Sequence, residues 1–370
     1  MRVRHIMLAG ALCCPVTLAA QRHVAETGFL WRLGTDTTQI ERVRSDGPRM
    51  QGVHLTRVPA TTVREWSAEL GPDGSVRHFE QIVRRGRSIV SRRRMAFTGD
   101  SVTQTLVRGD STSDTTVAAP AGTLPDLPNS YAFLELALRR LSGRDSADYW
   151  LLPPGGDAVE RAVLVRGRGD TVLLRLEGLP PITLRVESTG RIVWANNLGT
   201  VVTRVPAPDM DALAAGFASR PLGSLSPRDT ARAAIGGTQV FVDYGRPARR
   251  GRVIFGGLVP WNEVWRTGAN RTTTLVTDGD VVVGDVTLAA GSYALFTIPT
   301  PAGWTLIINR NVGSGLDYDE GQDVARVPMR AERVPQGVDR FTIALEPRGA
   351  HALLSFTWEH TRAAVAVRRR

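Results

Sequence analysis

The chain has 370 residues, of which 46 are arginine and none is lysine, and its formal net charge at pH 7 is +10. The charge is dispersed: residues 225–367 carry 15 arginines against 14 acidic residues, and residues 368–370 form a basic tail of three arginines. A nucleic-acid surface gathers its positive charge on one face or stripe, so nucleic acid is not expected as a partner. The length suggests two domains of about 100–200 residues each.

Residues 1–20 predict a secretory signal peptide. Arg2 and Arg4 precede an apolar run over residues 6–18, and small residues follow up to Ala20, which is the order of a signal peptide cleaved near that position. The run is shorter than the roughly 20 residues that cross a membrane. We therefore expect a periplasmic or secreted protein with no transmembrane segment after cleavage. Both cysteines lie inside the signal, so the mature chain would have no disulfide and no thiolate metal site.

Residues 21–204 predict a β-rich N-terminal domain. Apolar and polar residues alternate there in short runs, as they do in half-buried strands; the runs are 51–57, 62–70, 76–84, 101–107, 162–168, 171–177, 182–187 and 191–195. One helix is expected over residues 131–141, where apolar side chains form a broad stripe and Asn129 or Ser130 supplies the N-cap. We expect an antiparallel sheet packed on this helix. The helix either closes the core or covers a space for a lipid-like ligand.

Residues 205–224 are expected to form a linker, because prolines interrupt them and only a short helical stretch is indicated at 209–217. From residue 225 to residue 367 the strand pattern resumes with almost no helical periodicity. The expected strands are 238–244, 272–277, 281–283, 286–288, 292–298, 304–309, 324–327, 340–345, 352–358 and 363–367. The pattern is typical of a β-sandwich or jelly roll, so the fold class is mainly β throughout.

Two runs in the C-terminal domain carry a family resemblance: DYGRP at 243–247 and WRTGAN at 265–270. Together with the segments around them, they make residues 225–367 resemble DUF2911. The resemblance implies an exported β-sandwich module and assigns no reaction to it. It does not extend to the N-terminal domain.

The polar and aromatic residues of these runs form a candidate ligand-binding site. Its members are Asp243, Tyr244, Arg246, Arg252, Trp265, Arg266, Thr267 and Asn270. Arginine offers a fork of donors suited to carboxylate or phosphate, and aromatic faces pack on sugar rings or apolar groups. The alternative is structural: Arg246 or Arg266 pairs with Asp243 or Glu263 and holds a loop in place.

The sequence favours a non-enzymatic cell-envelope module over an enzyme. The histidines of the C-terminal domain, His351 and His360, are far in sequence from the candidate site, and neither a GxSxG nor an HExxH motif occurs. Catalytic residues therefore stay unassigned. The expected partner is a small molecule, a glycan or an envelope protein. Two alternatives remain: a hydrolase or transferase with an unrecognised site at the Tyr/Arg/Trp/Asn cluster, and a carrier of a lipid-like ligand in the N-terminal domain.

An acidic segment resembles half of a calcium-binding loop, with Asp317, Asp319 and Asp323 placed around Gly321. An EF-hand loop requires glycine at its sixth position and glutamate at its twelfth. Counted from Asp317, the glycine is fifth and the twelfth residue is Pro328. The EF-hand pattern fails, which leaves a loosely bound calcium ion as the alternative to a solvated acidic loop. No other cofactor is expected.

Overall fold

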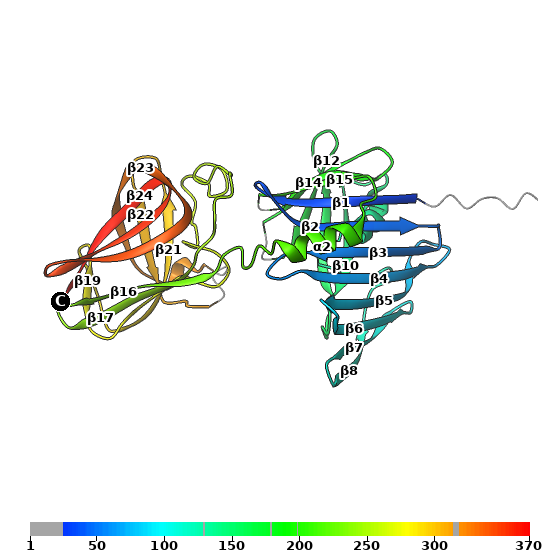
Figure 1. Cartoon of the computed structure of the whole chain (residues 1–370), viewed down its shortest axis with the longest axis horizontal. Coiled ribbons are helices and arrows are strands. Elements are labelled where there is room, and N and C mark those ends of the chain that lie inside the picture. Colours follow the sequence, from blue (N-terminus) through cyan, green and yellow to red (C-terminus); the bar gives the residue numbers. More distant parts are fainter. Residues whose placement is uncertain (1–24, 129, 178–179, 198, 314–317) are drawn as a thin grey trace, which may run out of the picture.

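The computed structural model describes residues 25–128, 130–177, 180–197, 199–313 and 318–370. The predicted signal peptide, both cysteines, the Asn129 cap and Asp317 lie outside these residues. Within them the chain is mainly β, as predicted, and its strands form two sheets that follow each other along the sequence (Figure 1). No helix in this part of the chain has both the length and the apolar character needed to cross a membrane.

Within the described residues, the N-terminal sheet has 15 strands. They are β1 (Ala25–Leu33), β2 (Asp36–Ser45), β3 (Arg49–Thr56), β4 (Thr62–Leu70), β5 (Val76–Arg85), β6 (Ser88–Phe97), β7 (Ser101–Arg108), β8 (Ser111–Ala118), β9 (Leu124–Pro125), β10 (Ser146–Leu152), β11 (Glu160–Arg166), β12 (Thr171–Leu176), β13 (Ile182–Val186), β14 (Ile192–Asn197) and β15 (Thr200–Val205). Strands β1–β8 form one antiparallel meander and β10–β15 form another. The meanders join where β1 pairs with β15, and β9 adds a short parallel edge beside β10.

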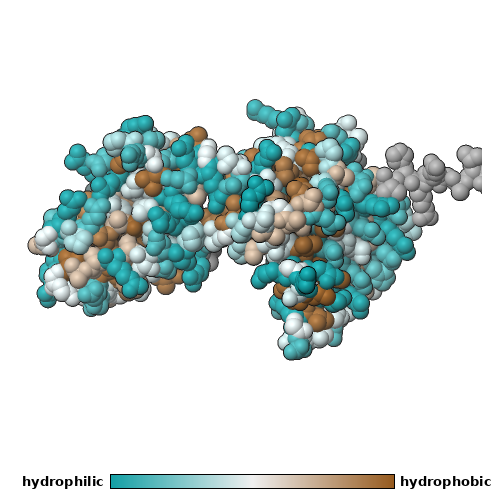
Figure 2. Space-filling view, in the orientation of Figure 1, coloured by the Kyte–Doolittle hydropathy of each residue, from teal (hydrophilic) through white to brown (hydrophobic). Residues whose placement is uncertain are grey.

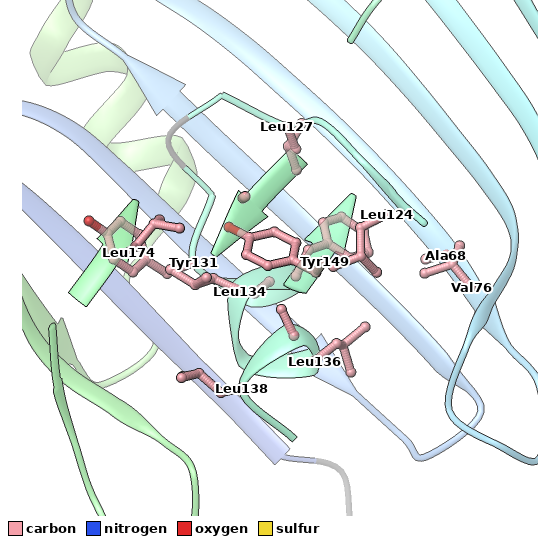
Figure 3. Packing of buried hydrophobic residues seen from close by; sticks show 14 of the residues in the cluster. Ala68, Val76, Leu124, Leu127, Tyr131, Leu134, Leu136, Leu138, Tyr149 and Leu174 are labelled. Carbon is pink, nitrogen blue, oxygen red and sulfur yellow. The ribbon is translucent and has the colours of Figure 1, made fainter. Parts of the chain in front are cut away.

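One helix is buried against this sheet. Helix α1 (Ala132–Leu138) continues into the 3-10 turn η1 (Arg139–Leu141), which matches the predicted helix over residues 131–141. Its apolar side chains belong to the same buried cluster as residues from both meanders, and Figure 3 shows Leu134, Leu136 and Leu138 of α1 among Leu124, Tyr149 and Leu174. The predicted Ser130 cap is wrong: Tyr131 occupies the N-cap position without a side-chain cap, because Ser130 Oγ donates instead to Glu41 Oε1 at 2.6 Å.

A second helix, α2 (Met210–Ser219), lies within the predicted linker and covers the opposite face of the sheet. Asp209 caps it by accepting hydrogen bonds from the N–H groups of Asp211 and Ala212, which is the role that aspartate serves at an N-cap. Met210 and Phe217 pack on Ile40 and Leu55. Ile40 is next to Glu41, whose side chain bonds the start of α1, and adjacent strand residues point to opposite faces. The two helices therefore sandwich the β2 region of the sheet.

Within the described residues, the C-terminal sheet has nine strands in the order β16-β17-β18-β21-β22-β23-β24-β19-β20. They are β16 (Arg228–Ile235), β17 (Thr238–Gly245), β18 (Thr274–Thr277), β19 (Val281–Val283), β20 (Val286–Leu288), β21 (Gly291–Pro299), β22 (Trp304–Asn309), β23 (Asp323–Arg348) and β24 (His351–Arg369), with the 3-10 turn η2 (Glu320–Gln322) before β23. The strands enclose one large buried cluster, and Ala294, Phe296 and Ile307 form a second, smaller one. Hydrophilic residues cover most of the visible face of both domains (Figure 2).

The last two strands are longer than predicted. The expected pairs 324–327 with 340–345, and 352–358 with 363–367, are each one continuous strand, β23 and β24. Their register shifts between Arg333 and Val338 and again between Val338 and Thr342. Irregularities of this kind interrupt the alternation of side chains without ending the strand pairing. In the sequence alone, this interruption of the pattern predicts a gap between strands.

Candidate functional site

The WRTGAN run forms a loop that is tied to strand β21 of the C-terminal sheet. Trp265 exchanges backbone hydrogen bonds with Thr297 on β21, at 2.7 and 2.8 Å. Thr267 is buried at a positive φ of 52°, and its carbonyl accepts a hydrogen bond of 2.7 Å from Thr273 Oγ1. A threonine in this backbone conformation is strained. The surrounding hydrogen bonds hold it there and so fix the directions of the neighbouring side chains.

Two glycines explain why the DYGRP and WRTGAN runs occur together. A Cβ on Gly245 would lie 2.0 Å from the carbonyl oxygen of Ala269, and a Cβ on Gly268 would lie 2.9 Å from the carbonyl oxygen of Gly245. The two runs therefore approach each other backbone to backbone, a distance that only glycine permits. Part of each motif therefore serves to pack the two runs against each other.

Aromatic side chains form the floor of this region. The Trp265 ring stacks on the Trp358 ring with centroids 5.9 Å apart and an interplanar angle of 20°. It also meets the edges of Phe341 at 5.0 Å and Trp304 at 6.3 Å. Such clusters hold ring orientations firmly, so the loop rests on a rigid base.

A cavity of about 510 Å³ opens beside Trp265, and both domains contribute to its wall. Its described lining comprises Leu33, Val58, Pro59, Ser224, Leu225, Ser226, Pro247, Ala248, Arg252, Leu258, Val259, Trp265, Arg266, Gly268, Ala269, Asn270 and Trp358. The volume is in the range of small-molecule sites. Most of these residues are apolar, two are arginines, and none of those described is acidic.

Arg266 is the unpaired cation of this cavity. It is half-buried, and within the described residues its guanidinium makes neither a hydrogen bond nor an ion pair. Removal from water lowers the pKa of Arg266 below its ordinary value, as burial does for any cation. A partly desolvated guanidinium without an anion is unfavourable, so the position is suited to an anionic ligand.

Arg252 supplies a second positive charge. Its Nε donates to the carbonyl of Arg249 at 3.0 Å and its Nη2 to that of Ala248 at 2.8 Å. In the part of the chain that the structure describes, no carboxylate lies within ion-pair distance of it. Burial, and then the neighbouring Arg250, lower its pKa. Its Nη1 faces the β14–β15 turn, where a Cβ on Gly199 would lie 3.5 Å away.

The domains are held together beside the cavity by the tip of the β1–β2 hairpin. Arg250 Nη1 forms an ion pair with Asp36 Oδ2, and the Arg250 side chain is only 10% exposed. Gly34, at a φ of +61°, lies so close that a Cβ there would be 1.6 Å from the carbonyl oxygen of Arg250. Only glycine allows this approach, and it places Leu33 at the cavity wall.

Of the eight candidate ligand residues, the structure brings four to this cavity: Arg252, Trp265, Arg266 and Asn270. Thr267 is buried and is not part of the described lining. Tyr244 is 1% exposed in the core, where its hydroxyl donates to the carbonyl of Ile343 at 3.4 Å and burial raises its pKa. Asp243 instead pairs with Arg228 on β16.

Arg246 also lies away from the cavity. Its Nη1 pairs with Asp229 Oδ2 at 3.2 Å and its Nη2 donates to Thr342 Oγ1 at 3.2 Å. The structural alternative named the wrong partners, since the acids that pair with arginine here are Asp229 and, for Arg228, Asp243. Arginine does hold this loop to the sheet, although through other residues.

Sequence reasoning missed the part of the cavity wall that comes from the N-terminal domain and the linker: Leu33, Val58, Pro59 and Ser224. These residues are apolar or small and lie far in sequence from the motif runs. Their types carry no signal for a site, because only the docking of the two domains brings them to it.

The acidic segment lies between the end of β22 and the start of β23. Asp323 accepts hydrogen bonds from Asn309 Nδ2 at 2.8 Å, Tyr318 Oη at 2.8 Å and Arg326 Nε at 2.9 Å. Asp319 accepts from the N–H of Gly321 at the start of η2. Asp317 lies outside the described residues. Among those described, no three His, Cys, Asp or Glu side chains are grouped so that they could hold a metal.

Comparisons with known proteins identify the C-terminal domain. Residues 226–367 match the family model described as protein of unknown function (DUF2911), so this domain is a DUF2911 domain, and the resemblance of its motif runs is confirmed. No curated protein matches the chain.

Two solved structures resemble parts of the fold. A DUF1089 family protein from Pseudomonas aeruginosa is 17% identical, with a TM-score of 0.35 over 43% of this chain and 89% of its own. A β-barrel-like protein of DUF1849 from Brucella abortus is 12% identical, with a TM-score of 0.35 over 50% of this chain and 94% of its own. Likenesses this distant support no inference about function.

Proposed function

We propose that the DUF2911 domain and the N-terminal domain together bind a small organic anion with an apolar or aromatic body, in the cavity beside Trp265. The observation that carries the proposal is Arg266: a half-buried guanidinium that lacks a partner within the described residues and lines a 510 Å³ cavity whose described walls hold no acid. A carboxylate or phosphate ester would pair with it through two parallel hydrogen bonds.

The apolar walls define the rest of the ligand. Trp265 and Trp358 lie on one side, while Leu33, Leu258 and Val259 belong to the same lining. Burial of apolar surface stabilises a complex by about 25 cal/mol per Å² before the costs of association are subtracted. A ligand with one anionic end and a compact ring or chain would use both the cation and the walls.

The lining favours binding over catalysis. Acid–base or nucleophilic chemistry requires a nucleophile and a base within hydrogen-bond reach. The described lining includes the hydroxyls of Ser224 and Ser226 but no His, Cys, Asp, Glu, Lys or Tyr that would activate them. Tyr244, the acid that a hydrolase or transferase would have used here, is in the core. We assign no calcium ion to this function; Asp323 accepts three hydrogen bonds from protein groups.

The setting of this function follows from the sequence. The segment over residues 1–20 has the order of a signal peptide, so we place the binding module in the periplasm or outside the cell. For the C-terminal domain we propose a β-sandwich. Support comes from side-chain packing between β17 and β23, which are not neighbours in the sheet: the rings of Tyr244 and Phe341 are 5.8 Å apart.

The test uses benzoate and phenyl phosphate as probes and benzyl alcohol as their neutral counterpart, titrated calorimetrically into the full chain. We expect at least one anion to bind clearly more tightly than the alcohol. Arg266→Ala should weaken that binding about tenfold to a hundredfold, because a hydrogen bond to a charged group contributes about 1.5–3 kcal/mol.

Arg271→Ala is the matched control. Arg271 is exposed, lies just beyond the WRTGAN run and is not part of the described lining, so its removal should leave affinity unchanged. Equal affinity for the anions and the alcohol, or an Arg266→Ala protein that binds as the wild type does, would overturn the proposal.

A further inference from the structure

A second cavity, of about 220 Å³, lies beneath α1 in the N-terminal domain. Its described lining comes from the segment before α1, from α1 itself and from strands of the second meander: Leu124, Pro125, Asp126, Leu127, Pro128, Ser130, Tyr131, Phe133, Leu134, Tyr149, Leu151, Leu174, Leu176, Ile182 and Asn197. Figure 3 shows several of these side chains gathered around α1. Leu151, Leu176 and Ile182 are only half-buried, which places the mouth of the cavity on their side.

Two tyrosine hydroxyls in this cavity have no hydrogen-bond partner among the described residues. Tyr131 is 5% exposed and Tyr149 is 3% exposed, and both line the space. In the described part of the chain neither hydroxyl makes a hydrogen bond. Neither hydroxyl is among the fully buried side-chain atoms that lack a partner, so each keeps some accessible surface. Hydroxyls that line a cavity and have no protein partner are free to donate to a ligand.

The position of Tyr131 is fixed by its surroundings. Its ring packs against Phe29 and Trp31, with centroids 5.6 Å away in each case. Its backbone N–H donates to Glu41 Oε2 at 3.3 Å, while the preceding Ser130 donates to Glu41 Oε1. Glu41 therefore holds the start of α1 in place. The side chain of Tyr131 is thus already fixed in position before any ligand binds.

The charge beside the tyrosines selects against anions. Asp126 lines the cavity; burial, and then the charge of Glu160, raise its pKa, while the charge of the buried Arg93 lowers it. The field of Asp126 also reaches Tyr149, whose pKa is raised mainly by burial and further by this carboxyl. A second carboxylate placed here would be repelled. A neutral group that accepts hydrogen bonds meets no such penalty.

We propose that this cavity binds the neutral acyl end of an ester, with the ester carbonyl accepting a hydrogen bond from Tyr131 or Tyr149 and the alkyl chain packing on Leu134 and Leu174. The size sets the chain length: apolar cavities of about 150 Å³ bind benzene, so 220 Å³ suits a chain of roughly six carbons or one end of a longer acyl group. This site has the opposite charge preference to the Arg266 cavity and does not depend on it.

The experiment titrates methyl hexanoate and hexanoate into the full chain by calorimetry. Methyl hexanoate should bind, and hexanoate should bind at least about tenfold more weakly near neutral pH. Tyr131→Phe with Tyr149→Phe should weaken methyl hexanoate binding about fivefold to tenfold, the equivalent of one neutral hydrogen bond.

Two measurements keep folding apart from binding. The Phe variants remove unpaired hydroxyls, so their melting temperatures should equal or exceed that of the wild type. Tyr293→Phe is the matched control, because its hydroxyl donates to Ala289 in the other domain. Arg266→Ala should leave methyl hexanoate binding intact. The experiment therefore distinguishes a failure of this proposal from a failure of the proposed anion site. No binding of methyl hexanoate, equal binding of hexanoate, or unchanged binding by the double Phe variant would each refute the proposal.

Discussion

Glu41 on β2 and His54 on β3 are direct cross-strand partners, and both are fully buried. Glu41 accepts hydrogen bonds from Ser130 and from the N–H of Tyr131. His54 stacks on Trp31 at 5.3 Å, and neither of its ring nitrogens has a hydrogen-bond partner. Burial raises the pKa of Glu41 to about 7. Burial and the charge of Arg64 lower the pKa of His54 to about 3. Between pH 3 and pH 7, two mainly neutral groups thus lie side by side beneath α1.

These shifts oppose each other in their effect on stability. The folded state binds the Glu41 proton more tightly than the unfolded state, so stability is full below pH 4.5 and falls as pH rises towards 7. The folded state disfavours the His54 proton, so stability is full above pH 6.5 and falls as pH drops towards 3. Between pH 4.5 and 6.5 the two slopes largely cancel.

Replacing His54 leaves the pH dependence of stability to Glu41 alone. A His54→Leu protein should lose about 3 kcal/mol of unfolding free energy between pH 4.5 and pH 7, from a shift of about 2.5 units at 1.36 kcal/mol each. Urea unfolding across this pH range measures it. A variant with flat stability would show that Glu41 is ionised in the folded protein.

Replacing Glu41 leaves the pH dependence of stability to His54, whose effect has the opposite sign. A Glu41→Gln protein keeps a group that can contact Ser130 and should become less stable as pH falls from 6.5 to 4.5, by about 2 kcal/mol. The same urea series measures it, and the double variant should show neither slope. Stability that rises on acidification would contradict a neutral, buried His54.

The ion pair between Asp36 and Arg250 links the domains beside the anion cavity. Asp36→Asn leaves the nearly buried guanidinium of Arg250 without its carboxylate, which should loosen the docking of the β1–β2 hairpin. We expect a larger radius of gyration in small-angle X-ray scattering and about fivefold weaker benzoate binding. Asp110→Asn, at an exposed turn of the same domain, should change neither; an Asp36→Asn protein that matches it would mean that the hairpin contact does not shape the cavity.

Alternation along the chain predicted many strands closely, including β4, β19, β20 and β22 with their exact ends. Alternation did not predict strands in which a buried position is occupied by a polar residue. Strand β6 contains Arg92, Arg93 and Arg94, yet Arg93 is 1% exposed and donates to Gln104 Oε1 at 2.9 Å and to the carbonyls of Asp126 and Leu152. In β2 a buried position is occupied by Glu41. A pattern that equates charge with exposure cannot find such strands, because their partners come from other strands.

What the sequence determined by itself is the β class, the α1 helix and the DUF2911 character of the C-terminal domain, since each depends on residue types at short spacing. It also held an unused signal for Tyr244: Val240, Val242 and Tyr244 alternate on the inward face of β17, and all three are buried. Only the tertiary structure decided which arginines are paired. Arg228 and Arg246 find acids on neighbouring strands, whereas Arg266 faces a cavity completed by the other domain. Charge pairing depends on distances through space, and no local pattern of residues sets those distances.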